Sequence, residues 1–122
     1  MEKSLRLLNI VKIIFFLFSA SIYGQDRYWV FFTDKEQSIS IYHPNDFLSQ
    51  ESLNRRINQG IEVIENDYPI SPEYIKEIEN LGFNVYIESR WLNAISVSLS
   101  APEEIADIKD MVFVNKVQKI KT

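Results

Sequence analysis

Residues with reactive side chains are few in this chain. It has no cysteine, and its one histidine, His43, stands in a polar segment directly before Pro44. A metal centre or a catalytic base would need carboxylates at fixed spacing around this histidine, and only Asp46 lies close to it in the sequence. We therefore interpret His43 as a loop residue, and we predict neither a metal site nor a cofactor site.

Sequence motifs for nucleophilic or phosphate chemistry are also missing. The chain contains no Gly-x-Ser-x-Gly and no glycine-rich phosphate loop. Its many carboxylates fall mostly on predicted helix surfaces and first turns, where the helix dipole stabilises negative charge. No two of them are marked as a pair for acid–base catalysis. The order of residues alone does not exclude a Ser-His-Asp triad, but we predict a non-catalytic module rather than an enzyme.

Two pairs of residues have more than one interpretation. Trp29 and Trp91 are interpreted as core or rim anchors of a folded domain rather than as a platform for sugars. The Arg55–Arg56 pair is the most basic spot after residue 24, and we interpret it as a solvated helix surface. Ion pairing of these arginines with Glu62 or Asp67 is the structural alternative.

Composition limits the classes of partner. The 122 residues are 46% hydrophobic and 13% aromatic, which is enough for one small domain with a packed core. The net charge of −4 argues against a general nucleic-acid binder, which would carry a basic patch. Because the chain lacks cysteine, we predict neither a disulfide scaffold nor a lipoprotein anchor.

Residues 1–24 have the features of a secretory signal peptide. Basic residues precede an apolar run at 13–18, and small residues follow it. A lysine next to the run leaves too few uninterrupted apolar residues for a span of about 20, so a retained membrane anchor is the less favoured alternative. Cleavage is predicted after Gly24 or after Ser21. We expect an exported domain, 25–122, that is periplasmic or extracellular and meets the membrane only through its leader.

Runs of β-branched and aromatic residues, or apolar residues at alternate positions, predict four strands. These strands lie at 27–34, 83–88, 91–99 and 112–117. The first of them is apolar on both sides, with Trp29 and Phe31 facing one way and Val30 and Phe32 the other. We therefore expect this strand to be central in its sheet and covered on both faces.

Capping residues and apolar stripes predict three helices. They lie at 49–59, at 71–82 and from Ser100 onward, where Pro102 falls in the first turn and Glu103 completes a capping box. The first of these helices belongs to an insertion at 36–66. Without that insertion the order of elements is βαββαβ, which predicts an α+β, ferredoxin-like fold. Its four-stranded antiparallel sheet would carry two helices on one face, plus the inserted helix after the first strand. The other face would be open for docking.

Three stretches of the sequence, taken together, resemble a known family. The first is Tyr-Trp-Val-Phe-Phe-Thr-Asp-Lys at 28–35, and the third is Ser-Arg-Trp-Leu-Asn-Ala-Ile-Ser-Val at 89–97. The second is made of the short runs at 47–49, 53–56, 59–61 and 67–70. In this order they are similar to the N-terminal prodomain of secreted subtilisin-like serine peptidases of Bacteroidetes type, over about 27–117.

The resemblance implies a non-catalytic prodomain, which acts as intramolecular chaperone and temporary inhibitor of a subtilisin-like serine peptidase in cis or in trans. In such families the open sheet face docks on two surface helices of the peptidase, and the C-terminal segment lies in its cleft. Here the docking strands would be 83–88 and 91–99. The tail at 116–122 would pair with the enzyme by backbone hydrogen bonds. The implied partner-binding residues are Glu88, Arg90, Trp91, Lys119, Ile120, Lys121 and Thr122.

Several alternatives stay open at this point. Glu88 either caps a helix N-terminus on the partner or is a solvated turn acid. The catalytic Asp, His and Ser blocks of such peptidases do not occur in these 122 residues, so we expect no peptidase activity from them. The chain would then be a truncated peptidase or a stand-alone inhibitor. The remaining alternative is an envelope binding or structural module that is not tied to a peptidase.

Overall fold

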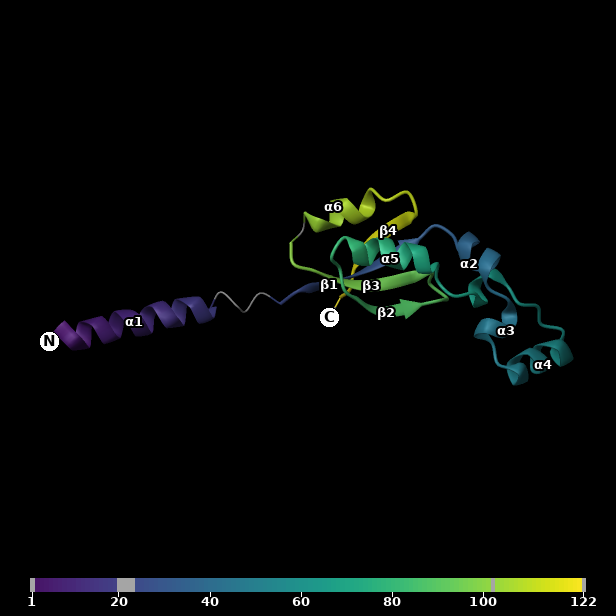
Figure 1. Ribbon diagram of the computed structural model, residues 1–122, viewed down its shortest axis with the longest axis horizontal. Coiled ribbons are helices and arrows are strands. Elements are labelled where there is room, and N and C mark those ends of the chain that lie inside the picture. The colour runs from purple at the N-terminus through teal and green to yellow at the C-terminus, as the bar shows by residue number, and fades with distance from the viewer. Residues whose placement is uncertain (1, 20–23, 102, 122) are drawn as a thin grey trace.

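The computed structural model describes residues 2–19, 24–101 and 103–121 (Figure 1). After an N-terminal helix, the chain contains both strands and helices. In chain order the elements are α1 (Glu2–Ser19), β1 (Asp26–Phe32), α2 (Glu36–Ile41), α3 (Pro44–Phe47), α4 (Gln50–Gln59), the 3-10 helix η1 (Glu65–Asp67), α5 (Pro72–Asn80), β2 (Val85–Ser89), β3 (Ala94–Leu99), α6 (Glu104–Lys109) and β4 (Val114–Lys119).

The four strands form one antiparallel sheet in the order β2-β3-β1-β4. This confirms the predicted α+β class and its four-stranded antiparallel sheet. β1 is central, as its apolar composition predicts, and it pairs with β3 on one side and β4 on the other. Two irregularities in register occur, one between Phe31 and Phe32 and one between Val85 and Ile87. The irregularity in β2 changes which of its side chains point to each face.

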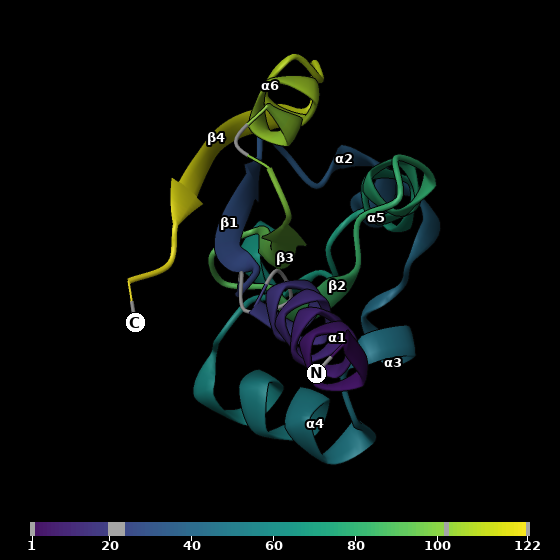
Figure 2. The same cartoon turned by 90° about the vertical axis from the view of Figure 1, so that its left-hand side faces the viewer.

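The hydrophobic core lies between one face of the sheet and the helices α5 and α6. Figure 2 shows both helices on the same side of the strands. The residues that are fully buried there come from the two central strands and the two helices, and they are Val30, Ile95, Val97, Ile78 and Ile108. The opposite face has no such cover, because Trp29 and Phe31 are only half-buried. The expectation that the first strand is covered on both faces is therefore wrong.

Helix α5 begins and ends where its capping residues predict. The Ser71 hydroxyl accepts a hydrogen bond from the Tyr74 N–H, and Gly82 follows with a φ of +95°. Helix α6 begins later than predicted, because its N-cap is Glu103 rather than Ser100. It begins at Glu104, whose carboxylate accepts hydrogen bonds from the Ser100 and Ala101 N–H groups. The Glu103 side chain forms no cap, and Pro102 lies outside the described residues.

The insertion between β1 and α5 contains more structure than one helix. The predicted helix is confirmed as α4, which Ser49 caps and Gly60 ends with a φ of +66°. The additional helices α2 and α3 are six and four residues long, too short to produce an apolar stripe that the sequence could reveal. Figure 1 shows α2, α3 and α4 beyond one end of the sheet.

Helix α1 covers most of the predicted leader. Within the described ranges, no helix is long and apolar enough to cross a bilayer. The signal peptide at 1–24 stays a prediction. Of its two cleavage positions, Gly24 is described and Ser21 lies outside the described residues.

Candidate partner-binding surface

The face of the sheet that α5 and α6 leave uncovered combines aromatic residues of β1 with small residues of β3. Trp29 lies opposite Ser96 in the register, and Phe31 lies opposite Ala94. Because residues paired in this way share one face, these four side chains form the centre of that surface. The surface is completed by the neighbouring strands, and we call it the open face: Arg27, Trp29, Phe31, Tyr86, Ile87, Ala94, Ser96 and Lys116.

Two cations lie over aromatic rings on the open face. The Arg27 guanidinium carbon is 4.5 Å from the centre of the Tyr86 ring, and the Lys116 Nζ is 4.4 Å from the centre of the Phe31 ring. Such contacts hold a positive charge at the surface and shield part of the ring from water. The open face is therefore aromatic at its centre and cationic at two of its edges, which suits a partner surface that is apolar with acidic groups at its border.

One polar group at the centre of the open face lacks a partner. The Ser96 Oγ is buried, and among the described residues it forms no hydrogen bond. Ser96 pairs with both Trp29 and Ile87 across the sheet, so larger side chains stand on each side of it. A buried hydroxyl without a partner costs free energy that the rest of the fold must supply. Ala94 and Ser96 have no exposed surface, so these small residues lie beneath the larger side chains of β1 and β2 that form the exposed part of the open face.

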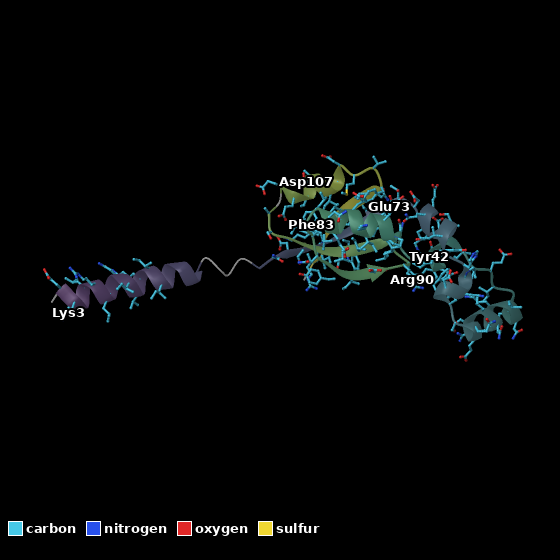
Figure 3. All side chains as sticks on the ribbon, in the orientation of Figure 1. Lys3, Tyr42, Glu73, Phe83, Arg90 and Asp107 are labelled. Carbon is cyan, nitrogen blue, oxygen red and sulfur yellow. The ribbon has the colours of Figure 1, made fainter. Side chains whose placement is uncertain are left out.

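The end of β2 and the turn that joins it to β3 contain three of the residues that the resemblance marks as partner-binding. Trp91 is 69% exposed, although it is large and apolar. Glu88 is exposed too, but it pairs with Ile95, and this register assigns it to the face that carries the helices. Figure 3 shows Arg90 at the end of the sheet that adjoins the insertion. The structure thus brings Arg90 and Trp91 to the insertion and separates Glu88 from the open face.

Lys35 joins the end of β1 to the insertion and to this turn. It is 1% exposed, and its Nζ donates hydrogen bonds to three backbone carbonyls: those of Asn66 at 3.1 Å, Tyr68 at 2.7 Å and Arg90 at 2.6 Å. Burial lowers the pKa of Lys35, and the neighbouring Arg90 lowers it further, while Glu65 and Asp67 act in the opposite direction. The three N–H groups of the ammonium match three acceptors, so the buried charge is fully hydrogen-bonded.

The sequence contains no signal for the role of Lys35. It follows a strand, in a position typical of a solvated loop lysine, and its acceptors lie 31, 33 and 55 residues away. Asn93 holds the same region from the other side. Its Nδ2 donates to the carbonyls of Phe32 and Asp34, and its φ of +48° is one that asparagine tolerates better than most residues.

The two adjacent arginines of α4 have different environments. The Arg56 guanidinium binds the Asp67 carboxylate through two nitrogens, at 3.0 and 2.8 Å. This confirms the ion-pair alternative for Arg56, whereas Arg55 is exposed and contacts only the Ser52 hydroxyl among the described residues. Burial would raise the pKa of Asp67. Hydrogen bonds from the Ile64 N–H and from Arg56 outweigh it, so the pKa lies below its ordinary value.

A groove of about 530 Å3 lies between the insertion and the β2–β3 turn. We call it the insertion groove. Its apolar lining comes from Leu48, Ile61, Ile64 and Trp91. Its polar lining includes Arg55, Arg56, Glu62 and Asp67. A second hollow shares Leu48, Arg56, Asp67 and Trp91 with it and continues to Glu88, Ser89 and Arg90. Trp91 therefore stands at the junction of the insertion groove and the β2–β3 turn.

The C-terminal residues continue the sheet further than the sequence predicts. β4 ends at Lys119, whose Nζ is 3.0 Å from the Asp26 carboxylate, and the Ile120 N–H donates to the Arg27 carbonyl. The hydrogen-bonded ion pair with Asp26 raises the pKa of Lys119. Of the implied tail, 116–119 is thus part of β4. Ile120 and Lys121 follow the strand, and Thr122 lies outside the described residues.

The described residues contain no group of three or more histidine, cysteine, aspartate and glutamate side chains arranged to hold a metal ion. His43 is exposed at the start of α3, and its backbone N–H donates to the Asp46 carboxylate at 2.7 Å. This contact caps a short helix, and Pro44 occupies its first turn. The closeness of His43 and Asp46 in the sequence thus reflects a local structural role.

Comparison with known proteins gives one match. A family model described as the peptidase S8 propeptide domain of Bacteroidota matches residues 27–122, from the second residue of β1 to the last residue of the chain. No curated protein and no solved structure matches the chain.

Proposed function

Because the chain belongs to the Bacteroidota family of peptidase S8 propeptide domains, we propose that 25–122 acts as a folding chaperone and temporary inhibitor of a secreted subtilisin-like serine peptidase. The partner is a peptidase domain, in cis or in trans, and these residues supply no catalytic group. Export through the leader at 1–24 is part of this proposal, since a prodomain has to reach the compartment where its peptidase folds.

The open face is the observation that carries the proposal. A sheet with helices on one face and half-exposed aromatic residues on the other has buried only part of the apolar surface available to it. Trp29 and Phe31 gain burial only when a second surface covers them. A pair of peptidase surface helices would cover the larger side chains that surround the buried residues Ala94 and Ser96.

The inhibitory part of the proposal concerns the residues after β4. Lys119 is paired with Asp26 and is hydrogen-bonded in the sheet, so we assign it to anchoring the tail rather than to entering a cleft. The Ile120 N–H is also hydrogen-bonded, to the Arg27 carbonyl, so we assign entry into the peptidase cleft to Lys121 and Thr122. An extended segment of this kind binds an enzyme by adding a strand to one of its sheet edges, where main-chain hydrogen bonds provide affinity.

Glu88 is assigned a smaller part than the resemblance implies. Its register places it on the helix-bearing face, so it approaches the partner only at the very end of the sheet. Arg90 and Trp91, in the turn that follows, are better placed for the interface. Trp91 exposes most of its surface there, and buried tryptophans carry a large share of the binding energy of protein interfaces.

The proposal is tested with the full chain, produced with its own leader, and a purified S8 peptidase domain from a Bacteroidota species. We expect slow, tight inhibition of peptide hydrolysis and a higher yield of active peptidase after refolding. Trp29→Ala should weaken inhibition at least about tenfold, since it removes a large apolar group from the centre of the interface.

The matched control for this experiment is Leu81→Ala, which changes an exposed apolar residue next to α5, on the helix-bearing side. It should inhibit like the wild type. If the wild-type chain neither inhibits the peptidase nor affects its refolding, the proposal is wrong, and a binding or structural module becomes the better description.

A further inference from the structure

The insertion groove lies outside the open face and is still exposed and apolar. Ile61 and Ile64 are 50% and 51% exposed, and Trp91 is 69% exposed. All three line one groove of about 530 Å3. Helix α4, which forms one of its walls, buries none of its own residues. An amphipathic helix that packs none of its side chains fully into its own domain has apolar surface left for a partner.

Directed polar contacts hold the groove in shape before any partner binds. The Lys35 ammonium connects Asn66 and Tyr68 of the insertion to Arg90 of the β2–β3 turn, through three carbonyl oxygens. The Arg56–Asp67 pair connects α4 to η1. These contacts fix both walls of the groove relative to the sheet. A preformed groove loses less conformational entropy on binding than a loop that must first become ordered.

The groove and the open face are parts of one continuous side of the molecule. In Figure 2, α4 lies on one side of the sheet and both α5 and α6 lie on the other, while Figure 1 shows α4 beyond one end of the sheet. The β2–β3 turn forms the junction, since Trp91 lines the groove and directly precedes the strand that forms the centre of the open face. A partner large enough to cover the open face therefore reaches the groove without any change in the orientation of the domain.

We propose that the insertion groove is a second docking surface for the same peptidase, and that it takes an apolar side chain from a peptidase surface loop next to a carboxylate. This inference rests on the proposed function, because it assumes that the open face binds the peptidase. It assigns to the insertion at 36–66 a part in selecting the peptidase that the chain binds.

Arg55 favours an acidic neighbour for that apolar side chain on one side of the groove, whereas Glu62 gives another part of the lining the opposite charge. Arg56 is neutralised by Asp67, whereas Arg55 forms no ion pair within the described part of the chain. Glu62 also lines the groove without an ion-pair partner, and its carbonyl accepts from Arg56. A carboxylate of the partner placed near Arg55 gains a charge-assisted hydrogen bond. It must also lie away from Glu62, because the two negative charges repel each other.

Four single variants of the full chain test the inference against an S8 peptidase domain from a Bacteroidota species. Ile61→Ser and Arg55→Glu change the groove. Their controls are Ile41→Ser, at a residue of similar exposure in α2, and Lys76→Glu, on α5 at the opposite side. We expect each groove variant to raise the inhibition constant about tenfold, and each control to change it less than twofold. Circular dichroism verifies that all four variants fold.

The outcomes separate this inference from the proposed function. If the wild-type chain inhibits and Ile61→Ser inhibits equally well, the groove is not a docking surface, and the proposed function is unaffected. If the wild-type chain does not inhibit at all, the proposed function fails and the inference fails with it. Sedimentation of the chain alone identifies a different occupant: a dimer that Ile61→Ser dissociates would show that a second copy fills the groove, and would overturn the inference.

Discussion

The sheet unit and the insertion are stabilised by different kinds of interaction. In the sheet unit, Val30, Ile95 and Val97 have no exposed surface and pack beneath α5 and α6. In the insertion, α3 and α4 bury no residue fully, and the strongest contacts are the Lys35 hydrogen bonds and the Arg56–Asp67 pair. Apolar burial is non-directional and grows with area, whereas a buried ion or ion pair depends on the presence of every partner.

This difference indicates a division of labour within one small domain. The sheet unit supplies most of the free energy of folding, because it removes most of the apolar surface from water. The insertion adds little burial, but its polar contacts hold the groove at a defined place beside Trp91. A segment such as the insertion, which buries little apolar surface, opens locally at a lower free energy than that needed to unfold the whole protein. The following predictions test the comparison, beginning with the largest expected effect.

The largest loss of stability is expected from a cavity in the sheet unit. Ile95→Ala removes three carbon atoms at a residue with no exposed surface, where β3 faces both helices. The free energy of unfolding should fall by about 2–5 kcal/mol, through lost burial and the cavity left behind. Urea denaturation measured by circular dichroism gives the value.

The control for this prediction is Ile39→Ala, because Ile39 is 44% exposed in α2 of the insertion. Its cost should stay within about 0.5 kcal/mol. Equal losses for the two variants would contradict the comparison, since the insertion would then contribute apolar burial to the same core.

The second effect is expected at the link between the two regions. Lys35→Met keeps a long side chain and removes the ammonium, so the carbonyls of Asn66, Tyr68 and Arg90 lose their shared donor. We expect a loss of about 1–3 kcal/mol, concentrated in the insertion. Limited proteolysis with mass spectrometry should show new cleavage within 36–66, while the sheet still unfolds in one cooperative transition.

Lys109→Met is the matched control for the lysine substitution, because Lys109 is exposed in the last turn of α6. It should leave the cleavage pattern unchanged. If Lys35→Met instead unfolds the sheet and the insertion together, the two regions form a single cooperative unit and are not stabilised separately.

The same contrast explains which parts of the fold the sequence could predict. The sheet unit follows local rules. A run of β-branched and aromatic residues locates β1, alternation locates β3, and Ser71 and Gly82 mark the limits of α5, because each signal lies within a few residues of the structure it specifies. Where two adjacent residues compete for a local role, as Glu103 and Glu104 do before α6, spacing alone selects the wrong one.

The insertion depends on contacts that local rules do not contain. Lys35 becomes buried only when segments far apart in the chain meet, and no pattern around it distinguishes it from a solvated lysine. The pairing of Arg56 with Asp67 is an alternative that the sequence suggests without selecting it over Glu62. The open face could be anticipated from the order of elements, whereas the insertion groove required the placement of α4 beside Trp91.

A third, smaller effect concerns pH, and it too acts on the insertion. The pKa of Asp67 is lower in the folded chain than its ordinary value of about 3.9. A carboxylate with a depressed pKa adds stability that is fully present above its unfolded pKa and is lost as pH falls through its folded pKa. Asp67→Asn should therefore cost about 1–2 kcal/mol at pH 7, and this cost should shrink progressively as pH falls below the ordinary pKa, measured by urea denaturation at pH 7 and at a series of acid pH values.

Asp34 titrates in the same direction and remains in this variant. Burial would raise its pKa, but hydrogen bonds from Thr33, Tyr74 and the Glu36 N–H lower it overall. The chain therefore keeps part of its acid sensitivity after Asp67→Asn. Asp110→Asn, at an exposed residue, serves as control and should change stability by less than about 0.5 kcal/mol at either pH. A cost for Asp67→Asn that does not shrink in acid would show that packing, rather than charge, holds η1.

The smallest effect on stability is expected at the open face, and it has the opposite sign. Ser96→Ala removes a buried hydroxyl that has no hydrogen-bond partner among the described residues, so stability should rise by up to about 1 kcal/mol in thermal denaturation. Ser98→Ala, at the next residue of β3 on the same face, is the control and should change stability less, because its side chain is only half-buried.

A protein that keeps an unpaired hydroxyl at the centre of its docking surface has not optimised that surface for the free chain. Inhibition measured with the same variant then distinguishes two cases: unchanged inhibition assigns the cost to folding alone, whereas weaker inhibition shows that the hydroxyl finds its partner on the peptidase.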